Sequence, residues 1–154
     1  MIFAVAPLNI DRQNLFEALE CAQLCYEKPY AKNTCNSFHN ALHAAETLVS
    51  AGSLLYTINR NAISIDYFSP ELRYALGIAS LFLDFRHPGV QPDFLKHTRE
   101  PIALQYEGTS LLERMHCAET FQFLSKFNCL PEDAVQYSNF RHACTQMILA
   151  TDFK

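Results

Sequence analysis

Apolar residues recur every three or four positions along most of the chain, which is the spacing of an amphipathic helix. The pattern predicts a first helix from Asn9 or Asp11 to about Glu27. Its apolar stripe consists of Leu15, Leu19, Ala22 and Tyr26. Residues 28–33 predict a loop, because they contain a proline, which lacks a backbone donor, and an asparagine, which favours turns.

The segment FHNALHAA at 38–45 is the centre of a second helix that is expected to run to about Arg60. Asn36 or Ser37 is the expected cap. The helical period is carried by Leu42, Ala45, Val49 and Leu55. On such a helix His39 and His43 lie one turn apart, with Cβ atoms roughly 5–6 Å apart. That is close enough to share a metal, a water or an anion, although such pairs are more often ordinary structural histidines.

A third helix is predicted from Glu71 to about Phe85. Ser69 supplies a capping hydroxyl, and Pro70 suits the first helical position. The helix is apolar nearly all round, which is typical of a core helix packed on several sides. It ends in the polar segment DFRHPG at 84–89. Polar groups at the end of a buried helix indicate either a site or a capped terminus with a surface salt bridge.

The C-terminal half predicts one short helix at 91–97, a loop through Gly108 and two longer helices. Ser110 and Glu113 fit a capping box, which is a purely structural role for that carboxylate. The helix they open reaches about Lys126, with a stripe of Leu112, Met115, Ala118 and Phe121 or Gln122. The last helix opens at 131–133, with Val135, Phe140, Cys144, Met147 and Ile148 expected to point inward. The pattern therefore predicts a compact all-α bundle, with residues 1–154 as one domain.

The composition argues against nucleic-acid binding and against a membrane span. The chain has 154 residues, 49% of them hydrophobic, and a net charge of −4, with no basic cluster of the kind that binds nucleic acid. Its longest apolar run, residues 75–83, is far short of the ~20 residues that a membrane span needs. Six scattered cysteines without a C-x-x-C pair are expected to be reduced and mostly buried. With no recognisable signal peptide, the expected location is intracellular, in an unspecified compartment.

Four ordered segments resemble the catalytic domain of class I 3′,5′-cyclic-nucleotide phosphodiesterases. The FHNALHAA segment is similar to the family's Y-H-N-x-x-H-A-A motif, and LDFRHPGV at 83–90 is similar to H-D-x-D-H-P-G-V. Residues 103–106 and 111–113 resemble A-L-x-Y and the start of V-L-E-N-H-H, and residues 149–152 read L-A-T-D. The resemblance covers roughly the first half of a family domain, which is all-helical and of the HD type. It therefore implies a truncated domain.

The resemblance implies a role for each matching residue. His39 would be the general acid that protonates the leaving ribose oxygen. His43 would bind zinc, and Asp84 would bridge zinc to magnesium, as in two-metal chemistry with an activated water. Three further residues would support them from around the metals: His87, Glu113 and His116.

The departures from the family pattern fall on the metal site. Leu83 stands where the family has a second zinc-binding histidine, and its isobutyl group has no donor atom. Arg86 replaces an acidic residue and would repel divalent ions. Further replacements are Phe38 for tyrosine, Pro92 for asparagine, and Arg114 and Met115 for the family's asparagine and histidine. Because a zinc site needs three or four protein ligands, most of the zinc affinity should be lost.

We therefore expect a degenerate, catalytically inactive phosphodiesterase-like protein, with no cofactor, acting as a structural or interaction subunit. Apolar faces of the helices at 71–85 and 131–153 would then contact other protein subunits or a second copy. In such a site Arg86 would pair with Asp84 or Glu113 in place of the metals. The alternative is a divergent phosphodiesterase that hydrolyses cAMP or cGMP with zinc and magnesium, in which His87, Glu113 or His116 replaces a lost ligand. A third hypothesis, a sensor that binds the nucleotide uncleaved, has no base pocket in this sequence.

Overall fold

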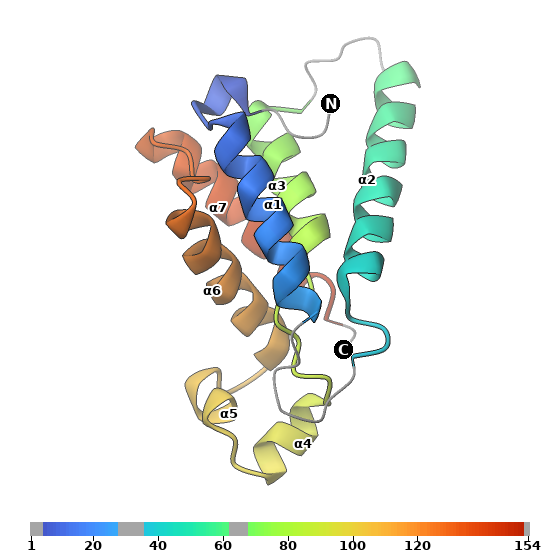
Figure 1. Ribbon diagram of the computed structural model, residues 1–154, viewed down its shortest axis with the longest axis vertical. Coiled ribbons are helices and arrows are strands. Elements are labelled where there is room, and N and C mark those ends of the chain that lie inside the picture. The colour runs from blue at the N-terminus through green and yellow to red at the C-terminus, as the bar shows by residue number, and fades with distance from the viewer. Residues whose placement is uncertain (1–4, 28–35, 62–67, 153–154) are drawn as a thin grey trace.

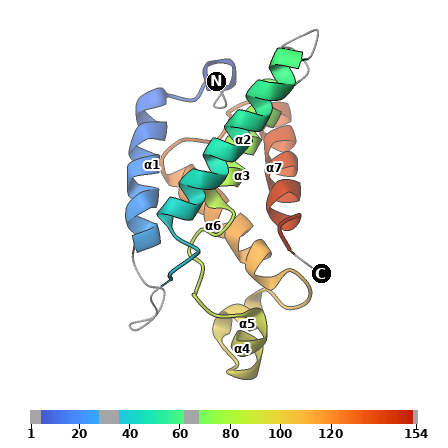
Figure 2. The same ribbon diagram turned by 90° about the vertical axis from the view of Figure 1, so that its right-hand side faces the viewer.

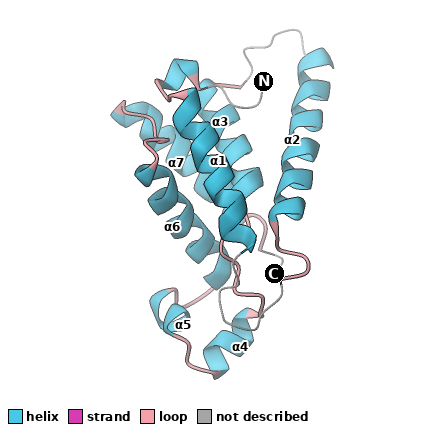
Figure 3. Ribbon diagram, viewed as in Figure 1, coloured by secondary structure: helices cyan, strands magenta, loops and turns pink. Residues whose placement is uncertain are grey.

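The computed structural model describes residues 5–27, 36–61 and 68–152, and these residues form helices, turns and loops without any strand (Figure 1, Figure 3). A 3₁₀ turn at Ala6–Leu8 precedes seven α-helices. These are α1 (Arg12–Glu27), α2 (Ala41–Asn61), α3 (Pro70–Phe82), α4 (Pro92–His97), α5 (Pro101–Gln105), α6 (Leu111–Lys126) and α7 (Ala134–Leu149). The all-α prediction is confirmed. The short α5 was missed, since five residues after a proline give no usable period.

Three of the long helices, α1, α3 and α7, begin at a local capping residue. The Asp11 carboxylate accepts backbone N–H groups of residues 13 and 14 at 2.6 and 3.1 Å, so α1 begins where the sequence predicted. Ser69 caps α3 through its hydroxyl, which accepts from the Leu72 N–H at 3.3 Å. Asp133 caps α7 in the same way, with N···O distances of 2.9 and 3.0 Å. These ends are set by sequence-local hydrogen bonds, which is why they were predictable.

Helix α3 is the centre of the molecule, as its apolar surface predicted. It packs most extensively on α7 and next on α2 (Figure 1). The Tyr74 ring is fully buried against Phe140 of α7, and its hydroxyl donates to the Cys129 carbonyl oxygen at 2.8 Å. Helices α7 and α2 bury most of the apolar surface of α3, and Leu72, Leu76 and Leu81 stay half-buried. All five described cysteines are free thiols, and three of them are buried, which agrees with the reduced state expected.

Helix α2 lies at the edge of the bundle and crosses in front of α3 in Figure 2. The predicted stripe is wrong for this helix, because Leu42 and Val49 are 68% and 67% exposed. The buried positions are Ala44 and Leu55. Helix α7 shows a smaller error: Val135 was expected inside but is 67% exposed, in the first turn of the helix.

A second, smaller apolar cluster lies beside the main core and is formed by α4, α5 and the start of α6. Its buried members are Leu95, Ile102, Ala103, Leu111, Leu112 and Met115. Helices α4 and α5 pack against each other at the end of the molecule near the first turn of α6 (Figure 1). The polar turn that follows α3 leads directly into this arm, so the arm borders the candidate site.

Candidate functional site

The residues before α2 form a cap that places two histidines. The Asn40 side-chain oxygen accepts from the backbone N–H groups of Leu42 and His43, at 3.0 and 3.1 Å, and so caps α2. His39 lies in the bend before the helix, where its N–H donates to the Asn36 side chain at 3.0 Å. The prediction of two histidines on one helix face is therefore wrong. Their ring centroids are still only 6.4 Å apart, because the bend turns His39 back towards α2.

Asp84 is the point at which these histidines meet α3. It lies in the turn directly after the helix, and 13% of its side chain is exposed. One carboxylate oxygen, Oδ2, is 2.8 Å from His39 Nδ1 and 3.5 Å from His43 Nε2. The His39 Nδ1 and Asp84 Oδ2 atoms are buried and close, yet neither has an aligned hydrogen bond among the described residues. The contact is thus a close approach of an imidazole nitrogen to a carboxylate oxygen, too short to hold a metal ion between the two atoms.

Two further histidines continue the cluster inward. The His87 ring stacks on His39, with centroids 3.9 Å apart and an angle of 8° between the planes, and His116 follows at 5.6 Å. The Gly89 N–H donates to His87 Nδ1 at 3.0 Å, which requires a lone pair on that nitrogen. His116 Nδ1 lies 2.7 Å from the Phe85 carbonyl oxygen, and a carbonyl only accepts, so this nitrogen carries a proton.

Burial keeps the two inner histidines neutral. Desolvation lowers the pKa of His116 to about 4, against the smaller opposing effect of its bond to the Phe85 carbonyl. Burial also lowers the pKa of His87 to about 4, and the neighbouring rings of His39 and His116 add to the effect. Of the sequence-predicted group, His39 and His43 contact Asp84, and His87 and His116 extend the cluster through stacked rings.

Arg86 does not take the role expected for it. Its Nη1 lies 3.0 Å from Glu119 Oε2 of α6, in a partly exposed ion pair. The expected pairing with Asp84 or Glu113 is wrong. The backbone at Arg86 is left-handed (φ 59°), and its side chain extends to α6 instead. The side chains that face Asp84 are His39 and His43.

The expected capping box at the start of α6 is also absent. Ser110 has a left-handed backbone and makes no capping hydrogen bond; its hydroxyl donates to Asp152 Oδ2 at 2.7 Å. Glu113 is half-buried, and desolvation raises its pKa, with further increases from the charges of Asp152 and Asp84. The Glu113 carboxylate is therefore close enough to the candidate site for the Asp84 charge to act on it. Asp152, near the C-terminal end of the described chain, acts on it in the same way.

Two contributors to the site were missed from the sequence. The Tyr26 hydroxyl donates to the Leu81 carbonyl at 2.6 Å, and its pKa is raised by burial and then by the Asp84 charge. The Asn36 side-chain amide donates to the His87 carbonyl at 3.3 Å and joins the bend before α2 to the turn after α3. Asp152 was part of the noted L-A-T-D segment, which was the one available signal for it. For Tyr26 and Asn36 no local pattern existed, since both contacts join distant segments.

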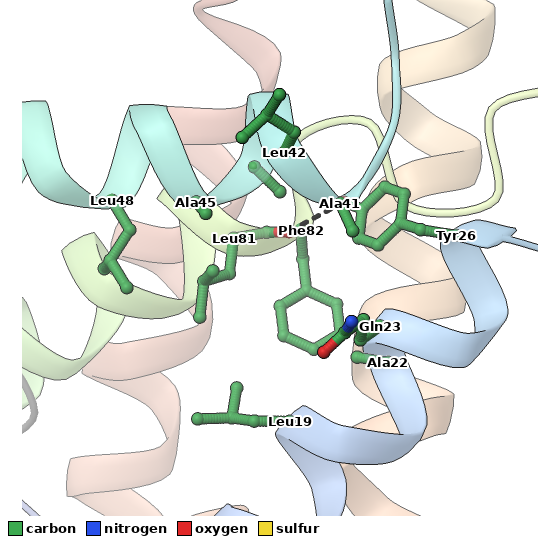
Figure 4. A pocket seen from close by; sticks show the side chains of 11 residues that line it. Leu19, Ala22, Gln23, Tyr26, Ala41, Leu42, Ala45, Leu48, Leu81 and Phe82 are labelled. Carbon is green, nitrogen blue, oxygen red and sulfur yellow. Dashed lines mark hydrogen bonds between the residues drawn. The ribbon is translucent and has the colours of Figure 1, made fainter. Parts of the chain in front are cut away.

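An apolar groove of about 540 Å³ opens next to Tyr26, between α1, α2 and α3 (Figure 4). Its walls are Leu19, Ala22, Gln23 and Tyr26 from α1, Ala41, Leu42, Ala44, Ala45 and Leu48 from α2, and Leu81 and Phe82 from α3. The walls carry almost no polar groups that could orient a charged nucleotide. The groove is therefore distinct in chemistry from the histidine cluster.

Residues 38–154 match the family model described as 3′5′-cyclic nucleotide phosphodiesterase. The chain belongs to this family. The match begins at the bend that carries His39 and continues through Asp84, so the phosphodiesterase segment includes the whole histidine cluster. The resemblance inferred from the four motifs is confirmed.

Known phosphodiesterases are similar to nearly all of this chain. The 3′,5′-cyclic-nucleotide phosphodiesterase regA of Dictyostelium discoideum is 29% identical over 163 residues, covering 96% of this chain and 20% of that protein. The 3′,5′-cyclic-AMP phosphodiesterase 4C of Rattus norvegicus is 35% identical over 132 residues, covering 84% of this chain and 24% of its own length. The chain thus spans about a fifth to a quarter of the curated relatives it matches.

Solved phosphodiesterase domains share the fold. The phosphodiesterase domain of the RhoPDE fusion protein from the choanoflagellate Salpingoeca rosetta superposes with a TM-score of 0.79 at 26% identity. That superposition covers 98% of this chain and 45% of the solved chain. A second structure of the domain from the same organism gives a TM-score of 0.78. In the part of the chain that the structure describes, no helix is long and apolar enough to cross a membrane.

The phosphodiesterase metal pair does not fit the donor atoms present in the described part of the chain. No group of three or more histidine, cysteine or acidic side chains there has a metal-binding arrangement. The matched ligand atoms, His43 Nε2 and Asp84 Oδ2, are 3.5 Å apart, close to the roughly 3.3 Å between ligands of a tetrahedral zinc at about 2.0–2.1 Å, so it is the number of donors and not their spacing that falls short. Leu83, at the C-cap of α3, contributes no donor. The residues that match the family's ligands are His43 and Asp84.

Proposed function

We propose that this phosphodiesterase-family domain does not hydrolyse cyclic nucleotides and serves as a structural or interaction subunit. The observation that carries the proposal is the environment of Asp84, the carboxylate that matches the family's metal bridge. It is preceded by a leucine in place of a ligand, and its Oδ2 atom is approached directly by His39. A carboxylate in close contact with an imidazole has to lose that contact before it can bridge two cations.

The number of donors supports the same conclusion. Metal ions in this family supply an activated water and charge stabilisation for phosphodiester cleavage. Leu83 removes one of the three family ligands that fall within this sequence and leaves His43 and Asp84, and the loss of a donor from a site that uses three or four weakens zinc binding. Zinc binding also requires neutral imidazoles, so it competes with any proton that His39 and His43 share with Asp84.

Two imidazoles face the Asp84 carboxylate directly. The His39 and His43 nitrogens face Asp84 within 3.5 Å, and each adds positive charge when protonated. Arg86 forms an ion pair with Glu119 and does not face Asp84. The stacked His87, neutral because of burial, closes the inner side of the cluster. A site in this state is a set of interior polar contacts that join α2 to the end of α3.

The second candidate is a divergent metal-dependent cyclic-nucleotide phosphodiesterase. It is favoured by the family match and by two buried atoms, His39 Nδ1 and Asp84 Oδ2, that lack aligned hydrogen bonds. A deprotonated imidazole nitrogen and a carboxylate oxygen both offer lone pairs, and buried polar atoms without hydrogen bonds are found at sites that take an ion or a water. In that case a small movement of His39 away from Asp84 would open the position.

Zinc content and turnover distinguish the two. Purified protein is to be incubated with zinc and magnesium, dialysed, and assayed for metal by mass spectrometry and for hydrolysis of cAMP and cGMP. We expect well under one zinc per chain and no turnover. Zinc near one per chain, with turnover that His39→Ala abolishes, would establish the enzyme instead.

A gain-of-ligand variant sharpens the test. Leu83→His restores a donor at the position before Asp84, whereas Leu83→Phe changes size and shape without adding a donor. We expect zinc retention to increase in Leu83→His only. Equal zinc binding by the histidine and phenylalanine variants would show that Leu83 is not what limits the site.

A further inference from the structure

The exposed side of α2 carries an apolar seam with a regular spacing. Positions 42, 45, 49, 52 and 56 follow one another at intervals of three and four, the a and d spacing of a coiled coil. Its three large members, Leu42, Val49 and Tyr56, are 68%, 67% and 66% exposed. Such a row of exposed apolar side chains on one helix is typical of a contact surface.

The small members of the seam allow close approach. Ala45 and Gly52 alternate with the large residues, and no atom lies within 4 Å of the place where a Gly52 side chain would begin. The surface around Gly52 is therefore open, and large residues of a facing helix have space there. At the N-terminal end the seam joins the groove beside Tyr26, since Leu42 and Ala45 line both (Figure 4).

The charges beside the seam indicate which partner fits. Apart from histidine, α2 has one acidic and one basic residue, Glu46 and Arg60, near its opposite ends. Both are exposed, and within the described residues neither takes part in an ion pair. They are 14 residues, or two heptads, apart, so they lie on the same flank of the seam.

We infer that a second copy of this chain docks antiparallel along the seam, with α2 packed on α2. A two-fold axis near Gly52 and Ser53 brings Glu46 of each copy to the level of Arg60 of the other, so two opposite-charge pairs form at once. In the same arrangement Val49 of one copy interdigitates with Tyr56 of the second. In a parallel copy Glu46 of one chain and Arg60 of the other would lie at different levels along the seam, so neither opposite-charge pair could form.

This inference gives the interaction role of the proposed function a specific partner, and it rests on that role. Its readout is association, so its failure is distinguishable from the presence or absence of metal-dependent turnover. Sedimentation velocity over a range of concentrations should show a reversible monomer–dimer equilibrium for the wild-type chain. A monomer at every concentration would overturn the inference.

Matched variants test the surface. Val49→Glu places a charge in the seam and should weaken dimerisation at least ten-fold. Val135→Glu makes the same change at an equally exposed valine on α7, 67% in both cases, and should leave the dissociation constant unchanged. Both sites are exposed, so circular dichroism should confirm folded protein. Equal effects of the two variants would mean non-specific association and would overturn the inference.

Charge exchange tests the orientation. Glu46→Arg and Arg60→Glu each turn two attractive pairs into repulsive ones, and we expect dimerisation about ten-fold weaker in each. The double variant should recover wild-type association. An equimolar mixture of the two single variants should also recover, because one copy then carries only positive and the other only negative charge at these positions. Absence of recovery in the double variant and the mixture would refute the antiparallel arrangement.

Discussion

Acidification should destabilise the protein through His116, whose ring is 2% exposed and surrounded by the helix core. The neutral ring donates from Nδ1 to the Phe85 carbonyl, and burial lowers its pKa to about 4. In the unfolded chain the same ring titrates near its ordinary value of about 6.5. The unfolded state therefore binds more protons between these two values. Stability from this group is complete above about pH 6.5 and is lost as the pH falls towards 4.

The size of the effect follows from the two pKa values. Between pH 7 and pH 5 the free energy of unfolding should fall by about 2 kcal/mol on account of His116 alone. For a chain of this length, that corresponds to a decrease of roughly 4–8 °C in melting temperature. Each pH unit between the two pKa values contributes about 1.4 kcal/mol, so the loss is steepest in that window.

The assay is urea unfolding followed by circular dichroism at several pH values, in the wild type and in His116→Asn. Asparagine retains an N–H donor at the δ position for the Phe85 carbonyl and does not titrate. We expect the variant to be less stable at pH 7 but to show the smaller decrease towards pH 5. Parallel stability curves, or an NMR titration that finds the His116 ring protonating near pH 6.5 in the folded protein, would refute the reasoning.

Substitutions at four further positions have effects that follow from the structure and can be measured by thermal or urea unfolding of dilute protein. Gly52→Ala should stabilise the chain by about 0.5–1 kcal/mol, because the helix loses a flexible residue and the new Cβ meets nothing. Gly108→Ala should destabilise it by about 1–3 kcal/mol, since φ is +108° there; a stabilising result would contradict this. Tyr74→Phe leaves the buried Cys129 carbonyl without its donor and should cost about 1–3 kcal/mol, and a neutral effect would show that water replaces it. Asp133→Ala should cost about 1 kcal/mol and Asp133→Asn much less, because asparagine also caps; equal losses would argue for charge instead.

The sequence predicted those features that depend on neighbouring residues. Ser69 and Asp133 cap their helices through backbone groups two or three residues away, so the local sequence contains all the information. The Ser110 prediction failed because its hydroxyl binds Asp152, 42 residues along the chain. Competition between a local and a distant acceptor is decided by tertiary packing, which a short motif cannot report.

The orientation of α2 was mispredicted for a related reason. This helix has apolar residues on several sides, so periodicity identifies a helix without identifying its buried face. The structure buries Ala44 and Leu55 against α3 and leaves Leu42 and Val49 outside. In the candidate site, the convergence of His39 and Asp84 was implied by the family motifs, yet the bend that makes it possible depends on Asn36 and Asn40.

The arm formed by α4 and α5 has a consequence for how the chain opens. Its cluster, which includes Leu95, Ile102 and Met115, draws on residues within one short stretch and is separate from the core around α3. A unit with its own apolar interior and mostly short-range contacts can unfold by itself while the larger core stays intact. Its amide protons therefore reach solvent through a sub-global fluctuation. The turn at 83–89 would lose its C-terminal support in that fluctuation, before the bundle as a whole comes apart.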